Sequence, residues 1–267
     1  MNKTQLLPDR PGIPPMAKLP DPETVDPGEL LRAYESGEID LICVLGPTAS
    51  GKTRYAVELA RALGKAEILS ADSRQVYTGM DIGTGKDLGE YGDVPYHLID
   101  IVPAGTTFNI YQYQSAFADA WADVRRRGSV PILCGGSGRY IESATRAYKF
   151  EKDNGVPVSR LPQSVYYIGT LVSREERVAR IDRRLEERLK EGLVEEIQSL
   201  LASGIPADDL IYYGLEYKFV TQYVLGQLSY EDMVVALGNA IHQFAKRQMT
   251  WFRGMERDGV RIHWVRP

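Results

Sequence analysis

The sequence contains little cysteine and little histidine. Its two cysteines exclude a disulfide scaffold, a four-thiolate zinc site and a cysteine-based iron–sulfur centre. The three histidines, His97, His242 and His263, are too far apart in the sequence for a metal-ligand spacing. No run approaches the roughly 20 apolar residues of a membrane helix, and residues 1–12 contain no hydrophobic signal-peptide centre. We therefore expect a cytoplasmic protein with no membrane association.

The chain also lacks an excess of positive charge. Its 32 Lys and Arg residues are outnumbered by 36 Asp and Glu residues, which gives a net charge of −4. A global positive field that attracts nucleic acid is thereby excluded, so any RNA-binding surface must be a local basic patch. With 267 residues, of which 43% are hydrophobic, the chain is long enough for one large α/β domain. We expect no protein partner.

The first 28 residues have little that could form a core. They contain seven of the 15 prolines of the chain, and closely spaced prolines favour extended structure. We interpret residues 1–37 as a Pro-rich tail that ends in a short helix over residues 29–36, and residues 38–267 as the folded domain. A proline-rich ligand for a partner domain is the alternative interpretation of the tail.

Short apolar runs alternate with helical patterns along the first part of the domain. Strands are predicted over residues 41–45, 66–70, 131–134 and 164–172, and helices over residues 54–63, 110–127 and 138–149. After residue 172 the pattern is mostly helical, over residues 174–203, 214–225 and 230–255, with a last short strand over residues 261–265. Strands that alternate with helices predict an α/β fold: a P-loop NTPase-like, doubly wound parallel sheet with additional C-terminal helices.

A phosphate-binding loop follows the first predicted strand. The residues GPTASGKT, from Gly46 to Thr53, fit the pattern G-x-x-x-x-G-K-[ST] and precede a predicted helix. Inward-pointing backbone N–H groups, the helix start and Lys52 can hold phosphate oxygens, and the Thr53 hydroxyl can bind Mg²⁺ between phosphates. The loop residues that we expect at the phosphates are Gly46, Thr48, Ala49, Ser50, Gly51, Lys52 and Thr53. The loop alone does not identify which polyphosphate is bound.

The acid that usually completes the magnesium site of an NTPase is not obvious. The strand at residues 130–134 runs into two glycines without an acid, and Asp100 after His97 is a weaker candidate. Asp72 is better placed, because it follows the second strand at the carboxyl edge of the sheet, where ligands bind in open α/β folds. Its carboxylate can accept a proton or hold a metal-bound water. A plain turn or helix-capping role is the alternative.

Five motifs occur in the same order as in a known enzyme family. They are GPTASGKT, SADSRQVYTGMDIGTGK at 70–86, PYHLIDIV at 95–102, ILCGGSGRYI at 132–141 and FAKRQMTWFR at 244–253. With them the chain resembles the tRNA dimethylallyltransferases over residues 40–257. The resemblance implies that the loop binds the pyrophosphate of dimethylallyl diphosphate instead of ATP. It also implies transfer of the prenyl group to N6 of an adenosine next to the tRNA anticodon, with Mg²⁺ as cofactor.

The same resemblance assigns roles to individual residues. Asp72 is implied as the base that takes the N6 proton, and Thr53 and Arg180 complete the catalytic set. Arg180, with Arg184 second, is implied at the diphosphate; the alternative is a solvated helix whose arginines pair with neighbouring glutamates. Contacts to tRNA are expected from Ser73, Arg74, Gln75, Ser137, Lys246, Arg247 and Gln248. Trp251 and Phe252 are expected in the core instead of stacking on a base.

The chain departs from the family pattern in its middle. A long helical insertion that grips the anticodon stem in the bacterial enzymes has no counterpart here, because only 26 residues separate Tyr140 from Tyr167 and a short polar stretch around residues 150–163 lies among them. Arg139 replaces an apolar residue, and Gly85-Lys-Asp87 replaces Ala-Lys-Pro. A reduced grip on RNA leaves prenylation of a free adenine nucleotide as an alternative function. Two rival classes also stay open: a small-molecule P-loop kinase and a catalytically lapsed RNA-binding relative.

Overall fold

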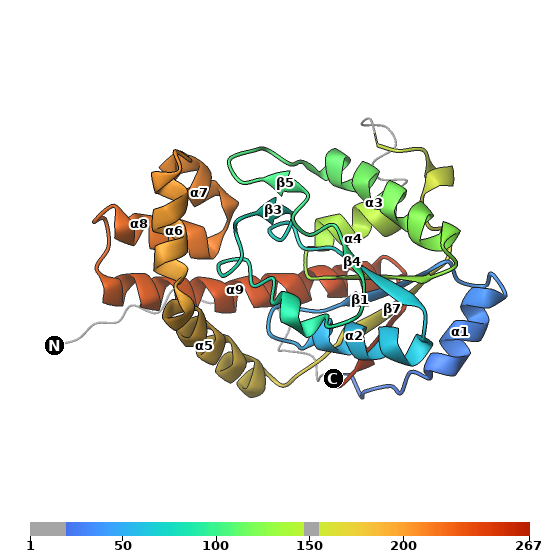
Figure 1. Cartoon of the computed structure of the whole chain (residues 1–267). Helices are drawn as coiled ribbons and strands as arrows, with labels where there is room; N and C mark the ends of the chain where they lie inside the picture. Colours follow the sequence, from blue (N-terminus) through green and yellow to red (C-terminus); the bar gives the residue numbers. More distant parts are fainter. Residues whose placement is uncertain (1–19, 147–154) are drawn as a thin grey trace.

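A six-stranded sheet forms the centre of the protein (Figure 1). The structure, a computed structural model, describes residues 20–146 and 155–267. The strands run in the order β4-β2-β6-β1-β7-β8, and every neighbouring pair is parallel. Their bounds are β1 (Leu41–Leu45), β2 (Ala66–Ser70), β4 (Tyr96–His97), β6 (Val130–Gly135), β7 (Val165–Thr170) and β8 (Ile262–Val265). A separate parallel pair joins β3 (Tyr77–Thr78) to β5 (Val102–Pro103). The prediction of a parallel α/β fold is confirmed.

The central position of β1 explains its sequence. All five of its residues are buried, because β6 lies on one side, β7 on the other, and helices cover both faces of the sheet. A strand buried on both faces reads as a continuous apolar run without alternation. The loop that follows β1 is thereby held at the middle of the sheet edge.

Helices cover both faces of the sheet and continue beyond it. They are α1 (Pro27–Glu35), α2 (Lys52–Leu63), α3 (Ile110–Arg126), α4 (Gly138–Thr145), α5 (Arg174–Glu191), α6 (Leu193–Ala202), α7 (Ala207–Tyr213), α8 (Leu215–Val224) and α9 (Tyr230–Arg257), with short 3-10 turns η1 (Leu88–Glu90) and η4 (Val158–Arg160). One face packs against α1 and α2 through residues such as Leu30 and Leu59. The other packs against α3, α4 and α9, which contribute Phe117, Ile141 and Phe252. Within the described ranges, the helices include none long and apolar enough to cross a membrane.

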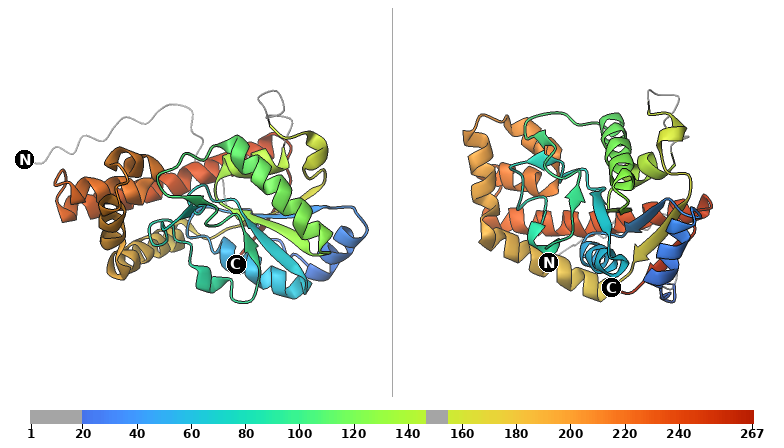
Figure 2. Two further views of the ribbon diagram at one scale, coloured as in Figure 1. Left: turned by 45° about the horizontal axis from the view of Figure 1, so that its top comes forward. Right: turned by 45° about the vertical axis from the view of Figure 1, so that its right-hand side comes forward.

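The C-terminal helices form a group beside the sheet. Helices α6, α7 and α8 gather near the start of α9, which runs from them to the sheet (Figures 1 and 2). The single helix expected over residues 174–203 is wrong, since Gly192, with φ of +107°, separates α5 from α6. Helix α7, between Pro206 and Gly214, was not predicted. The long α9 was predicted, and Ser229 caps its first turn by accepting the Asp232 N–H.

Two of the predicted segments, the tail and the helix over residues 138–149, lie only partly within the described residues. Of the expected tail, residues 1–19 lie outside the described part, while the Glu23 N–H donates to the Trp264 carbonyl (2.7 Å) beside β8. The helix expected at 138–149 ends at Thr145, and its last three residues lie outside the described part, as do residues 150–154 of the reduced insertion.

One buried acid on β2 offers a stability test. Burial alone would raise the pKa of Glu67. The hydrogen bonds from Arg127 (2.6 Å) and with His97 (2.7 Å) outweigh burial, so the pKa is lowered to about 2. We expect Glu67→Gln to lower the free energy of unfolding by about 2 kcal/mol at pH 7. Because the folded-state pKa is depressed, this contribution is present above about pH 4.5 and disappears as the pH falls from 4.5 towards 2. Urea denaturation at pH 7, 4 and 3 measures it, and a difference between the two proteins that does not change with pH would contradict the assignment.

Candidate active site

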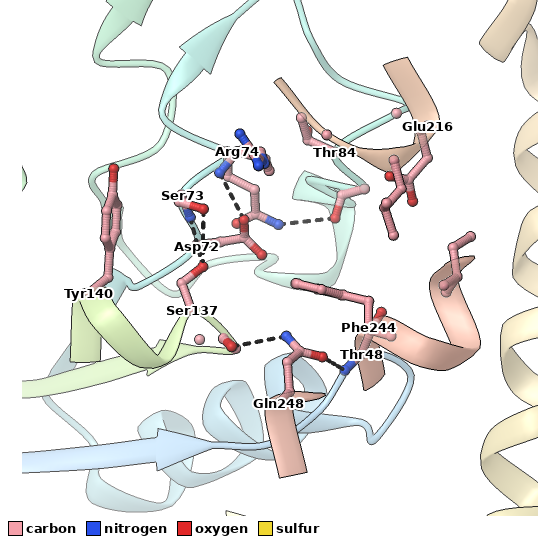
Figure 3. Close-up of a pocket in the computed structure, with 18 of the residues that line it drawn as sticks. Thr48, Asp72, Ser73, Arg74, Thr84, Ser137, Tyr140, Glu216, Phe244 and Gln248 are labelled. Carbon is pink, nitrogen blue, oxygen red and sulfur yellow. Dashed lines mark hydrogen bonds between the residues drawn. The ribbon is translucent and has the colours of Figure 1, made fainter. Parts of the chain in front are cut away.

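The carboxyl ends of the central strands meet at one cavity. The loops after β1, β2 and β6 converge there, as expected for parallel strands in an open sheet. The cavity has a volume of about 570 Å³, and Figure 3 shows several of the side chains that line it. Further walls come from α4, from residues 83–85 and from the C-terminal helices α5, α8 and α9. A volume of this size is typical of a small-molecule site.

The phosphate-binding loop has the backbone shape that anion binding requires. Ala49 (φ +60°) and Gly51 (φ +82°) adopt left-handed conformations, which turn successive N–H groups towards one side. The loop is fixed to β7 because the Ser50 hydroxyl bonds to the Thr170 hydroxyl (2.7 Å). A non-glycine residue in this conformation is strained, and such strain is common at functional sites. Four of the loop residues expected at the phosphates are not among the residues that line the cavity: Gly46, Ala49, Ser50 and Gly51.

Lys52 and Thr53 begin α2 directly after the loop. Both line the cavity, and so does Thr48. Burial lowers the pKa of Lys52, because a low-dielectric environment disfavours its charged form. A cation whose charge is poorly solvated gains most from a bound anion, so this end of the cavity is suited to phosphate.

Asp72 follows β2 and lines the same cavity. Its Oδ1 accepts the Arg74 N–H (2.9 Å), and its own N–H donates to the Ser70 hydroxyl (3.3 Å). The turn-capping role and the functional role are therefore compatible, since the Arg74 contact uses one of the two carboxylate oxygens. The carboxylate and the phosphate-binding loop open on one space, as the sequence led us to expect.

Two serines close the wall between the second and the sixth strand. The Ser73 N–H donates to the Ser137 Oγ (3.0 Å), and the two hydroxyls lie 3.3 Å apart (Figure 3). Both residues line the cavity, as do Arg74 and Arg247. Lys246 is exposed on α9 and lies outside the cavity lining. Of the residues expected at the RNA, these four cavity residues are thus brought together.

Two further residues expected at the RNA, Gln75 and Gln248, have amide groups that bind protein groups. Gln75 accepts from the Ser70 hydroxyl (3.1 Å) and donates to the Gly85 carbonyl (3.1 Å). Gln248 accepts the Thr48 N–H (2.8 Å) and donates to the Gly136 carbonyl (2.9 Å). Both side chains line the cavity and at the same time join its walls.

Arg180 and Arg184 differ in their relation to the cavity. Arg184 lines it, whereas Arg180 is not among the lining residues. The Arg180 guanidinium binds Glu176 (2.5 Å) and lies against the phosphate-binding loop, with Nη1 3.5 Å from the position that a Cβ on Gly51 would take. It therefore lies beside Gly51 of the loop and is paired with a neighbouring glutamate.

The two departures around Lys86 accommodate arginines of α5. Asp87 pairs with Arg184, and a Cβ on Gly85 would lie 1.6 Å from the Arg188 Nη2. Because only a glycine leaves that space free, and Gly85 also has a φ of +59°, the substitution pattern and the arginines fit one another. Arg188 itself lines the cavity, is 12% exposed and pairs with Glu216 (3.2 Å). Arg188 was not among the residues that the sequence assigned to the site.

Aromatic side chains complete the cavity, and most of them were not predicted. They are Tyr91, Tyr140, Tyr213, Tyr217, Phe244 and Trp251. Phe252 is buried as expected. The core assignment of Trp251 is wrong, since it is 38% exposed and lines the cavity. Its position in the FAKRQMTWFR motif, three residues after Gln248, could have indicated that Trp251 lies on the same face of the helix as Gln248.

Two models of known protein families match the sequence. A family model described as IPP transferase matches residues 75–163 and 149–255, and one described as isopentenyl transferase matches residues 39–93. The two parts of the first match meet at residues 149–163, where the sequence departs from the family pattern.

Similar proteins carry names of the same kind. A tRNA dimethylallyltransferase 2 from Bacteroides fragilis is 44% identical, with 85% of this chain and 93% of the relative covered. A tRNA dimethylallyltransferase 1 from Porphyromonas gingivalis is 46% identical, with 84% and 93% covered. The first alignment spans 285 positions, more than the 267 residues of the chain, because the relative contains residues that this chain lacks.

Solved structures show the same fold. A tRNA isopentenylpyrophosphate transferase from Bacillus halodurans has a TM-score of 0.72 at 29% identity, with 85% of this chain and 89% of that chain covered. The enzyme of that kind from Staphylococcus epidermidis has a TM-score of 0.72 at 30% identity, with 85% and 92% covered.

Proposed function

Because the chain belongs to the tRNA dimethylallyltransferase family, we propose that it transfers the dimethylallyl group of dimethylallyl diphosphate to N6 of an adenosine beside a tRNA anticodon. One observation supports this most directly: a phosphate-binding loop and the carboxylate of Asp72 open on a single cavity. A phosphotransferase can combine a phosphate-binding loop with a carboxylate as well, so the family of the chain decides in favour of prenyl transfer. Prenyl transfer to an amine uses both, one for the leaving group and one for the proton.

The leaving group is bound at the loop. As the C–O bond of the allyl carbon breaks, negative charge collects on the departing pyrophosphate, where Lys52 and the loop N–H groups stabilise it. Arg180 and Arg184 supply further positive charge from α5. The wall formed by α8 and α9 limits the access of water, which would otherwise capture a developing allylic cation.

The acceptor amine is bound beside the Asp72 carboxylate. The N6 lone pair forms the new C–N bond, and Asp72 accepts the proton that N6 releases. An exocyclic adenine amine is a weak nucleophile, so removal of its proton during bond formation lowers the barrier. The hydrogen bond from the Arg74 N–H holds the Asp72 carboxylate in place.

A Mg²⁺ ion fits the donor set at the phosphate end. Among the described residues, no group of three or more His, Cys, Asp or Glu side chains could hold a metal ion, so the ion would take most of its oxygen ligands from the diphosphate and from water, with Thr53 as the protein ligand. Mg²⁺ commonly binds with few protein ligands in this way. When bound, it neutralises charge on the phosphate oxygens.

The tRNA would lie over a local basic patch at the cavity mouth. We define this patch as Arg74, Arg139, Lys246 and Arg247. Arg74, Arg139 and Arg247 line the cavity, and Lys246 is exposed next to Arg247 in the sequence of α9. Phe244, Tyr140 and Trp251 provide aromatic surface for an adenine that leaves the anticodon stack. With tRNA as the acceptor, the cytoplasm is the proposed site of action, and the shortened segment at 150–163 predicts a reduced grip on RNA.

Product analysis tests the proposal. The protein is incubated with dimethylallyl diphosphate, Mg²⁺ and either tRNA or AMP, and the nucleosides are examined by mass spectrometry. We expect N6-dimethylallyladenosine in the tRNA sample. A prenylated product found only with AMP would show that a free nucleotide, not tRNA, is the acceptor. Phosphate transfer from ATP without any prenyl product would refute the proposal.

The two arginines of α5 can be separated by mutation. We expect Arg180→Gln to raise the Kd for magnesium pyrophosphate about tenfold, since a charge-assisted contact contributes about 1.5–3 kcal/mol. Arg183→Gln, exposed on the same helix, is the matched control and should leave the Kd unchanged. Titration calorimetry measures both. If only Arg184→Gln raises the Kd, Arg184 contacts the diphosphate, and Arg180 only pairs with Glu176.

A further inference from the structure

Gln248 joins three parts of the site with one side chain. From α9 it accepts the Thr48 N–H (2.8 Å) in the phosphate-binding loop and donates to the Gly136 carbonyl (2.9 Å) after β6. Figure 3 shows both bonds. The side chain is 8% exposed, so its bonds face little competition from water. A carboxamide can satisfy this combination of a donor and an acceptor, whereas a hydrocarbon side chain cannot.

The neighbouring glycines show that α9 lies close to these loops. A Cβ on Gly136 would lie 2.5 Å from the Gln248 Nε2, and one on Gly138 would lie 2.4 Å from the Trp251 ring. Side chains there would push α9 away from the sheet edge. The helix therefore contacts both loops at the turn that contains Gln248 and Trp251.

The residues of α9 on both sides of Gln248 line the cavity, where we place the acceptor nucleotide. Phe244, Arg247 and Trp251 line the cavity one helical turn or less from Gln248. A helix turn moves as a unit, because its backbone hydrogen bonds fix the relative positions of its residues. A nucleotide that contacts these three side chains thus acts on the residue that holds the phosphate-binding loop.

We propose that Gln248 is a positioning residue that couples acceptor binding on α9 to diphosphate binding at the loop after β1. A nucleotide bound against Phe244, Arg247 and Trp251 restricts the motion of this part of α9. Gln248 then keeps its hydrogen bond with the Thr48 N–H, so the loop is ordered before the diphosphate binds. Coupling of this kind is reciprocal: the diphosphate raises the affinity for RNA by the same factor. This inference rests on the proposed function.

The coupling is measured with two probes, magnesium pyrophosphate and an anticodon stem–loop RNA. In the wild-type protein we expect saturating RNA to lower the Kd for pyrophosphate at least fivefold. Gln248→Met keeps the length of the side chain and removes both hydrogen bonds, so this ratio should fall below two. Gln243→Met changes the same residue type at an exposed position of the same helix and should keep the wild-type ratio.

Each remaining outcome is decisive as well. A Gln248→Met protein that keeps the wild-type ratio overturns the inference, and so does a wild-type ratio below two. If Gln248→Met does not fold, Gln248→Glu replaces it: its oxygen still accepts the Thr48 N–H, the donor to Gly136 is lost, and the ratio must fall for the inference to stand. Wild-type protein that forms prenylated tRNA without coupling refutes only the inference, whereas protein that binds neither probe and forms no product refutes the proposed function too.

Discussion

Replacing Asp72 with asparagine is expected to lower kcat for tRNA prenylation by at least about 10²-fold. Asparagine retains an oxygen for the Arg74 N–H, so the turn after β2 should keep its shape. What is lost is the ability to accept the N6 proton as the C–N bond forms. Because Asp72 acts on the acceptor, the Kd for magnesium pyrophosphate should stay within about threefold of wild type.

The comparison with a remote aspartate makes this result specific. Asp119→Asn removes a carboxylate from α3 whose side chain is 67% exposed, and we expect wild-type turnover from it. Single-turnover measurements with preformed complexes separate the chemical step from product release. Turnover of Asp72→Asn within threefold of wild type would remove Asp72 from the mechanism and leave it the turn-capping role alone.

The parts of the fold that the sequence predicted depend on local or repeated signals. The strand at Leu41–Leu45 is a continuous apolar run because it is buried on both faces, and the glycines and Lys52 of the following loop are required by backbone shape and charge. Asp72 was found because parallel strands bring their carboxyl ends to one edge. These features can be interpreted without knowing how distant segments pack.

The missing features depend on contacts between distant segments. Nothing near Gly85 in the sequence indicates that Arg188 will occupy the space left by its absent side chain. In the same way, Gln248 was expected at the RNA because the FAKRQ motif resembles an RNA-facing segment, while its bonds to Thr48 and Gly136 exist only once α9 has packed on the sheet edge. Short elements such as β3, with two residues, carry too little pattern to be predicted.

Trp251 shows how the same limit affects function. Both Trp251 and Phe252 were expected in the core, and of the two only Phe252 is buried. Which of two adjacent aromatic residues faces the cavity depends on the rotation of α9 about its axis. That rotation is fixed by the close approach of the helix to Gly136 and Gly138.

Replacing Lys52 with methionine is expected to raise the Kd for magnesium pyrophosphate about 10²-fold and to lower kcat as well. Methionine is of similar length but carries no charge, so the phosphate oxygens lose their contact with the ammonium group. The effect on kcat follows because charge on the leaving group is greatest as the C–O bond breaks, and Lys52 stabilises that charge more than the ground state.

The pH dependence identifies the charge of Lys52 as the cause. Burial lowers the pKa of Lys52, so in the free protein its positive charge is lost at a lower pH than that of an exposed lysine. The difference in pyrophosphate affinity between wild type and Lys52→Met should therefore shrink as the pH rises from 7 towards 10, whereas Lys52→Arg should show no such decline. Titration calorimetry across this range measures both, and a difference that stays constant up to pH 10 would mean that Lys52 acts through its shape. Since the same cation stabilises the departing pyrophosphate and kcat/KM reports the ionisation of the free enzyme, kcat/KM of wild type and of Lys52→Arg should diverge over the same pH range.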